Sequence, residues 1–133
     1  MNRETVYSQK RIYIYTFDRK LFLATSQRTE KIYPIAVGKP QTPTPHGTYQ
    51  VVNKIINPGG ILGSRWLGLS IPNGPYGIHG TSRPESIGKA ISNGCIRMFN
   101  QDVEELFNSV SIGTTVIIKP LAEETGNVYA YTK

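Results

Sequence analysis

Cysteine is nearly absent from this chain of 133 residues, which contains only Cys95. A single cysteine excludes an internal disulfide and a cysteine-based zinc or iron–sulfur cage. Long apolar runs are also missing, since no stretch approaches the roughly 18 residues needed to cross a bilayer. The opening residues 1–5 include no apolar leader of the kind found in secretory signals. We therefore expect neither a transmembrane segment nor a signal peptide.

Charged residues are few, and they form no runs. They make up 18% of the chain against 38% hydrophobic residues, which fits neither a coiled coil nor a disordered tail. The length predicts a single domain over residues 1–133. Thirteen glycines and nine prolines indicate many turns and short strands rather than a helical bundle.

The formal net charge is +6, and the excess of lysine and arginine lies in the first half of the chain. Such a surface attracts polyanions, so nucleic acid and anionic cell-wall polymers are both candidate partners. However, the basic residues are scattered singly or in pairs, and no zinc-finger or RNA-binding signature is present. The charge is therefore better interpreted as a solubilising surface, and we expect no nucleic-acid partner.

Segments rich in β-branched and aromatic residues predict a mainly β fold. Residues 11–17 and 21–25, on either side of a polar turn, predict a hairpin. Further strands are predicted at 31–37, closed by Gly38, and at 48–56, 66–71, 114–119 and 128–132. The expected scaffold is mostly antiparallel.

One segment, at about 100–110, departs from the β pattern. Its apolar residues recur at the spacing of a single helical face, at Val103, Leu106, Phe107 and Val110. Asn100 is expected to cap the start of this helix, and the carboxylates at 102, 104 and 105 suit the positive end of its dipole. We therefore predict one main amphipathic helix whose carboxylates serve capping and solvation, not catalysis.

Cys95 and His79, one of only two histidines, are the candidate catalytic residues. A lone cysteine is usually a small core hydrophobe, but Cys95 lies between Gly94 and Arg97 in a polar stretch. A thiolate is a strong nucleophile, and a histidine nearby can take the thiol proton and later return it to a leaving amine. The sequence therefore indicates a cysteine nucleophile with a histidine base.

The backbone around these two residues has its own predicted roles. No carboxylate occurs near His79 before Glu85, so a local carbonyl, for example that of Gly80, is expected to orient the ring. Gly94 leaves room for a substrate carbonyl, and the N–H groups of Gly94 and Cys95 are predicted to form an oxyanion hole. No metal and no organic cofactor is implied.

These residues lie in two motifs. His79-Gly-Thr81, followed by Ser92-Asn-Gly-Cys-Ile-Arg-Met98, resembles the signature of the YkuD-type L,D-transpeptidases, including the usual interval of sixteen between histidine and cysteine. The segment Thr44-Pro-His-Gly-Thr-Tyr49 resembles the Thr-Pro-x-Gly-x-aromatic segment of that family. The resemblance covers roughly residues 9–120, although many members carry histidine where Asn93 stands.

The resemblance implies a β-sandwich-like catalytic domain of mixed sheets that rebuilds peptidoglycan cross-links at the cell wall, outside the cytoplasm. Cys95 would attack the bond before the terminal D-alanine of a tetrapeptide stem. A diamino-acid amine of a neighbouring stem would then resolve the thioester, giving a 3→3 cross-link. The stem peptides are thus the implied partners, and a monomer is expected.

The resemblance also implies individual roles. His79 would act as base and then acid, with Gly80 as its orienting carbonyl. The oxyanion and substrate-binding positions would be Gly94, Ser92, Arg97, Asn93 and Tyr76.

Two alternatives remain open. Hydrolysis on the same scaffold would make the chain an L,D-carboxypeptidase, and loss of catalysis would leave a peptidoglycan-binding module. A papain-like peptidase is disfavoured because its cysteine precedes its histidine. His46, in a second His-Gly-Thr sequence, is interpreted as an ordinary loop residue, and Trp66 as a core aromatic rather than part of a substrate groove.

Overall fold

The computed structural model describes residues 9–121. Within them the elements are β1 (Lys10–Tyr15), β2 (Lys20–Thr25), β3 (Thr29–Pro34), β4 (Val37–Gly38), β5 (Gly47–Ile56), the 3-10 turn η1 (Gly60–Leu62), β6 (Arg65–Leu69), β7 (Tyr76–His79), the 3-10 turn η2 (Pro84–Ser86), β8 (Ala90–Ser92), β9 (Ile96–Arg97), α2 (Asn100–Ser109) and β10 (Thr115–Lys119). Eight strands form one sheet in the order β3-β2-β1-β10-β5-β6-β7-β9, and β4 pairs with β8. The predicted mainly β fold with one main helix is confirmed.

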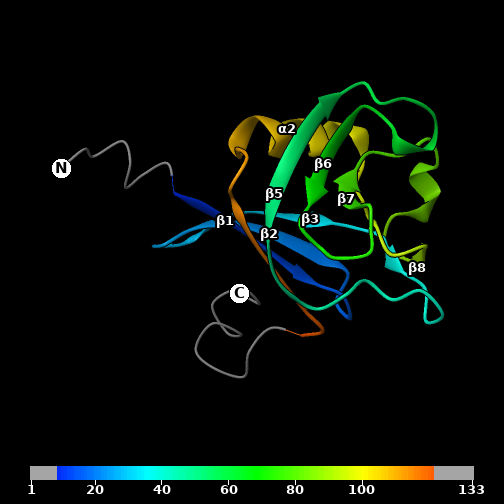
Figure 1. Ribbon diagram of the computed structural model, residues 1–133, viewed down its shortest axis with the longest axis horizontal. Helices are drawn as coiled ribbons and strands as arrows, with labels where there is room; N and C mark the ends of the chain where they lie inside the picture. Colours follow the sequence, from blue (N-terminus) through cyan, green and yellow to red (C-terminus); the bar gives the residue numbers. More distant parts are fainter. Residues whose placement is uncertain (1–8, 122–133) are drawn as a thin grey trace.

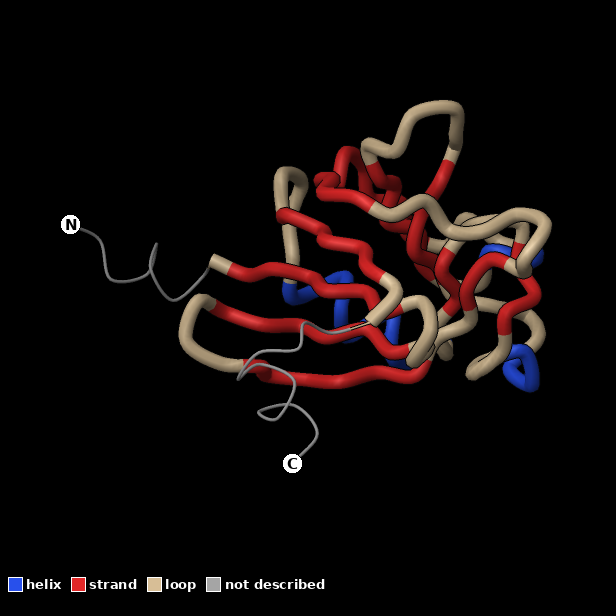
Figure 2. Tube along the Cα trace, turned by 90° about the horizontal axis from the view of Figure 1, so that it is seen from below, coloured by secondary structure: helices blue, strands red, loops and turns tan. Residues whose placement is uncertain are grey.

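The two sheets are mostly antiparallel, as predicted, but they also contain parallel pairs. Three strand pairs are parallel: β1 with β10, β7 with β9, and β4 with β8. The long strand β5 belongs to both halves of the sheet, because its first residues pair with β10 and its later residues pair with β6. The pairing with β6 begins at Val51 and has a register shift between Val51 and Asn53, and such bulges bend a strand. Figure 2 shows the resulting two groups of strands, which run in different directions.

Alternation along the strands builds one core from both halves of the sheet. Ile12 and Ile14 of β1 are fully buried, as are Leu67 of β6 and Ile78 of β7. The apolar face of α2 completes this core with Val103, Leu106 and Phe107. Figure 1 shows α2 lying across β5 and β6. The opposite face of the β6–β7–β9 region is therefore turned away from α2.

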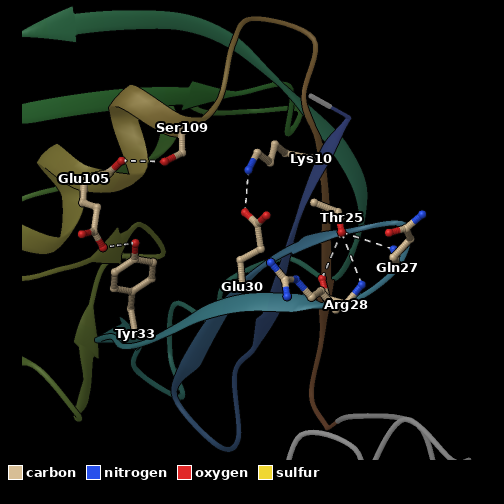
Figure 3. Close-up of polar contacts among 8 residues, drawn as sticks. All are labelled: Lys10, Thr25, Gln27, Arg28, Glu30, Tyr33, Glu105 and Ser109. Atoms are coloured by element: carbon tan, nitrogen blue, oxygen red, sulfur yellow. Dashed lines mark hydrogen bonds and ion pairs between the residues drawn. The ribbon is translucent and has the colours of Figure 1, made fainter. Parts of the chain in front are cut away.

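Polar contacts fix α2 to the sheet. The hydroxyl of Tyr33 donates a hydrogen bond to Glu105 at 2.6 Å (Figure 3), and burial, followed by this contact, raises the pKa of Tyr33. At the other end of the helix, Lys54 Nζ donates to the carbonyls of Phe107 and Val110, both at 2.7 Å. Lysine at a helix C-terminus satisfies carbonyls that lack intrahelical partners.

Three predictions about local structure need comment. The strand expected at 31–37 is split, because Pro34 ends β3 and the chain then turns so that Val37 starts β4. Asn100 is not the helix cap: Phe99 occupies that position, and the Asn100 side chain bonds to Ser64 and Thr81 instead. The strand predicted at 128–132 lies outside the described residues.

The structure also contains strands that the sequence did not indicate, namely β7, β8 and β9, which have two to four residues each. Across residues 9–121, no helix combines the length and apolar character needed to span a membrane.

Candidate active site

The strand register places Cys95 and His79 on one face of the sheet. Ile78 of β7 lies beside Ile96 of β9, and both are buried in the core. Side chains alternate along a strand, so His79 faces the opposite side, as does Arg97 of β9. Cys95 is the residue just before β9, and the same alternation puts its side chain on that side. His79 is level with Arg97 in the register, and Cys95 is two residues earlier. The predicted nucleophile and base are therefore diagonal neighbours on the face turned away from α2.

The His79 ring is buried, and its tautomer follows from its hydrogen bond. Nδ1 lies 2.6 Å from the carbonyl oxygen of Gly80. Because a carbonyl only accepts, Nδ1 carries the proton and Nε2 keeps the lone pair of a base. Burial lowers the pKa of His79 and Arg97 lowers it further, whereas backbone hydrogen bonds with Gly80 and Leu62 act in the opposite direction. The predicted orienting carbonyl is thus present at Gly80.

The Cys95 thiol is half-buried. Burial raises its pKa, while a backbone hydrogen bond from Gly77 and the charge of Arg97 lower it. The pKa of His79 moves down and that of Cys95 moves up, so the two directions favour a neutral thiol beside a neutral imidazole at rest. A thiolate–imidazolium pair would then form as the thiol attacks, when His79 takes the proton.

Ser92 and Gly94 form hydrogen bonds that hold the loop carrying Cys95. The hydroxyl of Ser92, which is buried, donates to the carbonyl of Cys95 at 2.6 Å and accepts the Gly94 N–H at 3.0 Å. Thr42 Oγ1 donates to the Ser92 carbonyl and Thr44 Oγ1 to the Gly94 carbonyl, both at 2.9 Å. The Gly94 N–H, predicted as an oxyanion-hole donor, is bonded to the Ser92 hydroxyl in this structure.

The reason for glycine at position 94 also differs from the one expected. Gly94 has a φ of 122°, a conformation that favours glycine. A Cβ there would lie 2.6 Å from Cε1 of Tyr76, so the Tyr76 ring packs directly on this loop. Asn93, one residue earlier, is exposed at the loop tip. Of the predicted substrate-binding positions, Tyr76 and Asn93 border Cys95, and Arg97 shares its face of the sheet.

Trp66 is buried, as predicted for a core aromatic, but it also lies against His79. Its ring stacks on that of His79, with centroids 5.8 Å apart and planes 19° apart. Its Nε1 donates to Asn53 at 3.1 Å. Cβ atoms on Gly68 and Gly77 would lie 3.0 and 2.6 Å from atoms of the indole. Trp66 is therefore buried on the site face, over two glycines, rather than within the main core; only the strand register could have indicated this.

The remaining sequence candidates lie elsewhere. His46 is exposed and its Nε2 lies 3.2 Å from Thr16 Oγ1, in agreement with its interpretation as a loop residue. Among residues 9–121, no group of three or more His, Cys, Asp or Glu side chains is placed to hold a metal ion.

Comparison with known proteins gives a consistent result. The family model described as the L,D-transpeptidase catalytic domain (YkuD) matches residues 9–118. A protein of Bacillus licheniformis with the name "Putative L,D-transpeptidase YkuD" is 55% identical over 102 residues, which cover 77% of this chain and 61% of that protein. A Bacillus subtilis protein of the same name is 53% identical over 100 residues, covering 75% of this chain and 60% of its own length. The chain thus matches about three-fifths of the length of these relatives.

Solved structures of similar fold include the catalytic domain of the L,D-transpeptidase of E. faecium, determined by NMR. It has a TM-score of 0.70 and 26% identity, and the match covers 84% of this chain and 98% of that one. L,D-transpeptidase 3 of Mycobacterium tuberculosis has a TM-score of 0.74 at 18% identity, covering 84% of this chain and 61% of that one. The second likeness is one of fold alone.

Proposed function

Because this chain belongs to the L,D-transpeptidase catalytic domain family, we propose that it is a cysteine acyltransferase that remodels peptidoglycan stem peptides at the cell wall. The observation that carries the proposal is the placement of Cys95 and His79 on one sheet face, with His79 Nδ1 bonded to the Gly80 carbonyl. This leaves Nε2 as the base for the thiol. Both pKa directions are those of a pair that is neutral until attack.

The reaction proceeds through a thioester. His79 takes the Cys95 proton as sulfur attacks the carbonyl that precedes the terminal D-alanine of a tetrapeptide stem. The C–N bond then breaks, and His79 returns the proton to the departing amine of D-alanine. The amine of a diamino acid in a second stem attacks the thioester and loses a proton to His79. The cysteine leaves as a thiol, and the product is a 3→3 cross-link.

The other residues of the face support this chemistry in distinct ways. The Cys95 N–H is the donor assigned to the developing oxyanion, since the Gly94 N–H is engaged. Arg97 supplies a positive charge that acts on both reacting groups, and it is suited to a carboxylate of the stem. Tyr76 and the exposed Asn93 flank the thiol and are the proposed contacts to the peptide. The net charge of +6 favours an anionic polymer.

The test is product analysis. The protein is incubated with a purified tetrapeptide-stem muropeptide, beside the Cys95→Ala and His46→Ala variants, and the products are identified by mass spectrometry. We expect a cross-linked dimer and free D-alanine with the unmodified protein and with His46→Ala, and neither with Cys95→Ala. Tripeptide monomer without dimer would assign the chain to L,D-carboxypeptidases. Substrate that stays intact but is retained by the protein would indicate a peptidoglycan-binding module.

A further inference from the structure

Asn100, the first residue of α2, uses its side-chain amide to join two backbone segments. Its Oδ1 accepts the N–H groups of Ser64 and Thr81, each at 3.1 Å. Its Nδ2 donates to the carbonyl of Thr81, also at 3.1 Å. The side chain thus connects the start of β6 with the residues that follow β7. Since Phe99 holds the cap position, these bonds are not part of helix capping.

Two glycines make room for this amide. A Cβ on Gly80 would lie 2.0 Å from Asn100 Oδ1, and a Cβ on Gly63 would lie 2.4 Å from the same atom. Any larger residue at either position would displace the amide. The two backbone segments and the Asn100 side chain therefore form one closely packed unit.

This unit includes the peptide group that is hydrogen-bonded to His79. The peptide group between Gly80 and Thr81 presents its N–H to Asn100 Oδ1 and its carbonyl to His79 Nδ1. A peptide group is planar, so holding the N–H direction also holds the direction of the carbonyl. The backbone of Leu62, next to Gly63, also acts on His79 and raises its pKa. The Gly80 and Leu62 backbone groups, which both raise the pKa of the imidazole, thus lie beside peptide groups of the Asn100 unit.

We propose that Asn100 is a positioning residue for the reaction, which fixes the tautomer and orientation of His79 through the Gly80–Thr81 peptide. The inference rests on the proposed function of His79 as the base. In many cysteine and serine enzymes an aspartate or asparagine contacts the histidine directly. Here the histidine meets a backbone carbonyl, and the side-chain amide acts one peptide group further away.

The proposal is tested with Asn100→Ala and Asn100→Asp, and with Lys54→Met as the matched control. Lys54 also stabilises α2, but at the opposite end, through the carbonyls of Phe107 and Val110. The primary readout is nitrogen NMR of the imidazole rings, which reports tautomer and pKa without any substrate. The chain has only two histidines, and exposed His46 serves as the internal reference. The secondary readout is kcat and KM with the muropeptide.

For Asn100→Ala we expect loss of the pure Nδ1–H tautomer, a lower His79 pKa, and kcat reduced about 10- to 100-fold with little change in KM. Asn100→Asp keeps an acceptor for both N–H groups and adds a negative charge, so the His79 pKa should rise instead. Arg97, the charged side chain that acts on the pKa of His79, is unchanged in both variants. Lys54→Met should lower stability and leave the His79 signals and kcat as they were.

The proposal is overturned if Asn100→Ala folds and His79 keeps its tautomer and pKa, or if Lys54→Met moves the His79 signals equally. Should Asn100→Ala fail to fold, Asn100→Asp decides, because an unchanged His79 pKa there would also refute the idea. If the unmodified protein turns over no muropeptide, the proposed function fails, while the NMR result still decides the role of Asn100.

Discussion

Replacing Ser92 with alanine tests how the cysteine loop is held. The Ser92 hydroxyl donates to the Cys95 carbonyl and accepts the Gly94 N–H, at 2.6 and 3.0 Å, and the residue is 2% exposed. Alanine removes both bonds while adding no bulk. The Gly94 N–H and the Cys95 carbonyl are then left without the hydroxyl that takes the place of water in the folded protein.

The magnitude follows from the two groups left without a partner. A buried donor or acceptor that loses its partner costs about 1–3 kcal/mol, and the two groups belong to one small loop that relaxes as a unit. The expected loss in the free energy of unfolding is therefore about 2–4 kcal/mol, a large share of the roughly 5–15 kcal/mol typical of a domain. For a chain of this size, a loss of 3 kcal/mol lowers Tm by roughly 10 °C.

Urea unfolding and the rate of Cys95 alkylation by iodoacetamide are the two assays. Ser109→Ala is the matched control, because Ser109 makes one exposed hydrogen bond to the Glu105 carbonyl within α2, and a change within about 0.5 kcal/mol is expected there. The Ser92 variant should also show an altered alkylation rate, since the loop that carries the thiol is no longer held by the Ser92 hydroxyl. A Ser92→Ala protein with the stability of Ser109→Ala and the unmodified alkylation rate would refute this account of the loop.

Three further predictions follow from the site. Burial lowers the pKa of His79 below its ordinary 6.5, so the histidine of the unfolded chain is protonated at a higher pH than that of the folded protein. The free energy of unfolding, relative to that of His79→Gln, should therefore fall as pH drops below about 6.5. A difference that is independent of pH in urea titrations would contradict this. Trp66, the only tryptophan, stacks on His79, so its fluorescence should titrate with that imidazole and lose the transition in His79→Gln; an identical titration in both proteins would argue against the stack. Arg97 lowers the pKa of both His79 and Cys95. The Arg97→Gln variant should therefore move the pH midpoint of Cys95 alkylation upward. An unchanged midpoint would show that the guanidinium does not act on the thiol.

The proposed reacting residues could be singled out from sequence because their signal is local. Cys95 is the only cysteine, and its motif and that of His79 are each contiguous in the chain. The orienting carbonyl of Gly80 is the next residue after the histidine and needs no long-range contact. The amphipathic helix was also predictable, since its apolar residues repeat within ten positions.

Other parts of the site depend on contacts between distant segments. The hydroxyls of Thr42 and Thr44 bond to carbonyls fifty residues away, and no periodicity in the sequence marks that pairing. Trp66 was assigned to the core because a strand pattern does not say which face turns inward, and a one-residue change of register exchanges the faces. The bond between the Gly94 N–H and the Ser92 hydroxyl was not predicted, because it forms only when the chain folds back within the loop.

The topology of the large sheet has a consequence for how the protein is made. β10, the last described strand, lies between β1 and β5, so the sheet has a gap at its centre until residues 115–119 have left the ribosome. The strands that carry Trp66, His79 and Arg97 all belong to the half of the sheet that begins with β5. Pairing over such a sequence separation is slow to form. The two halves of the sheet can therefore join only after nearly the whole described chain has emerged.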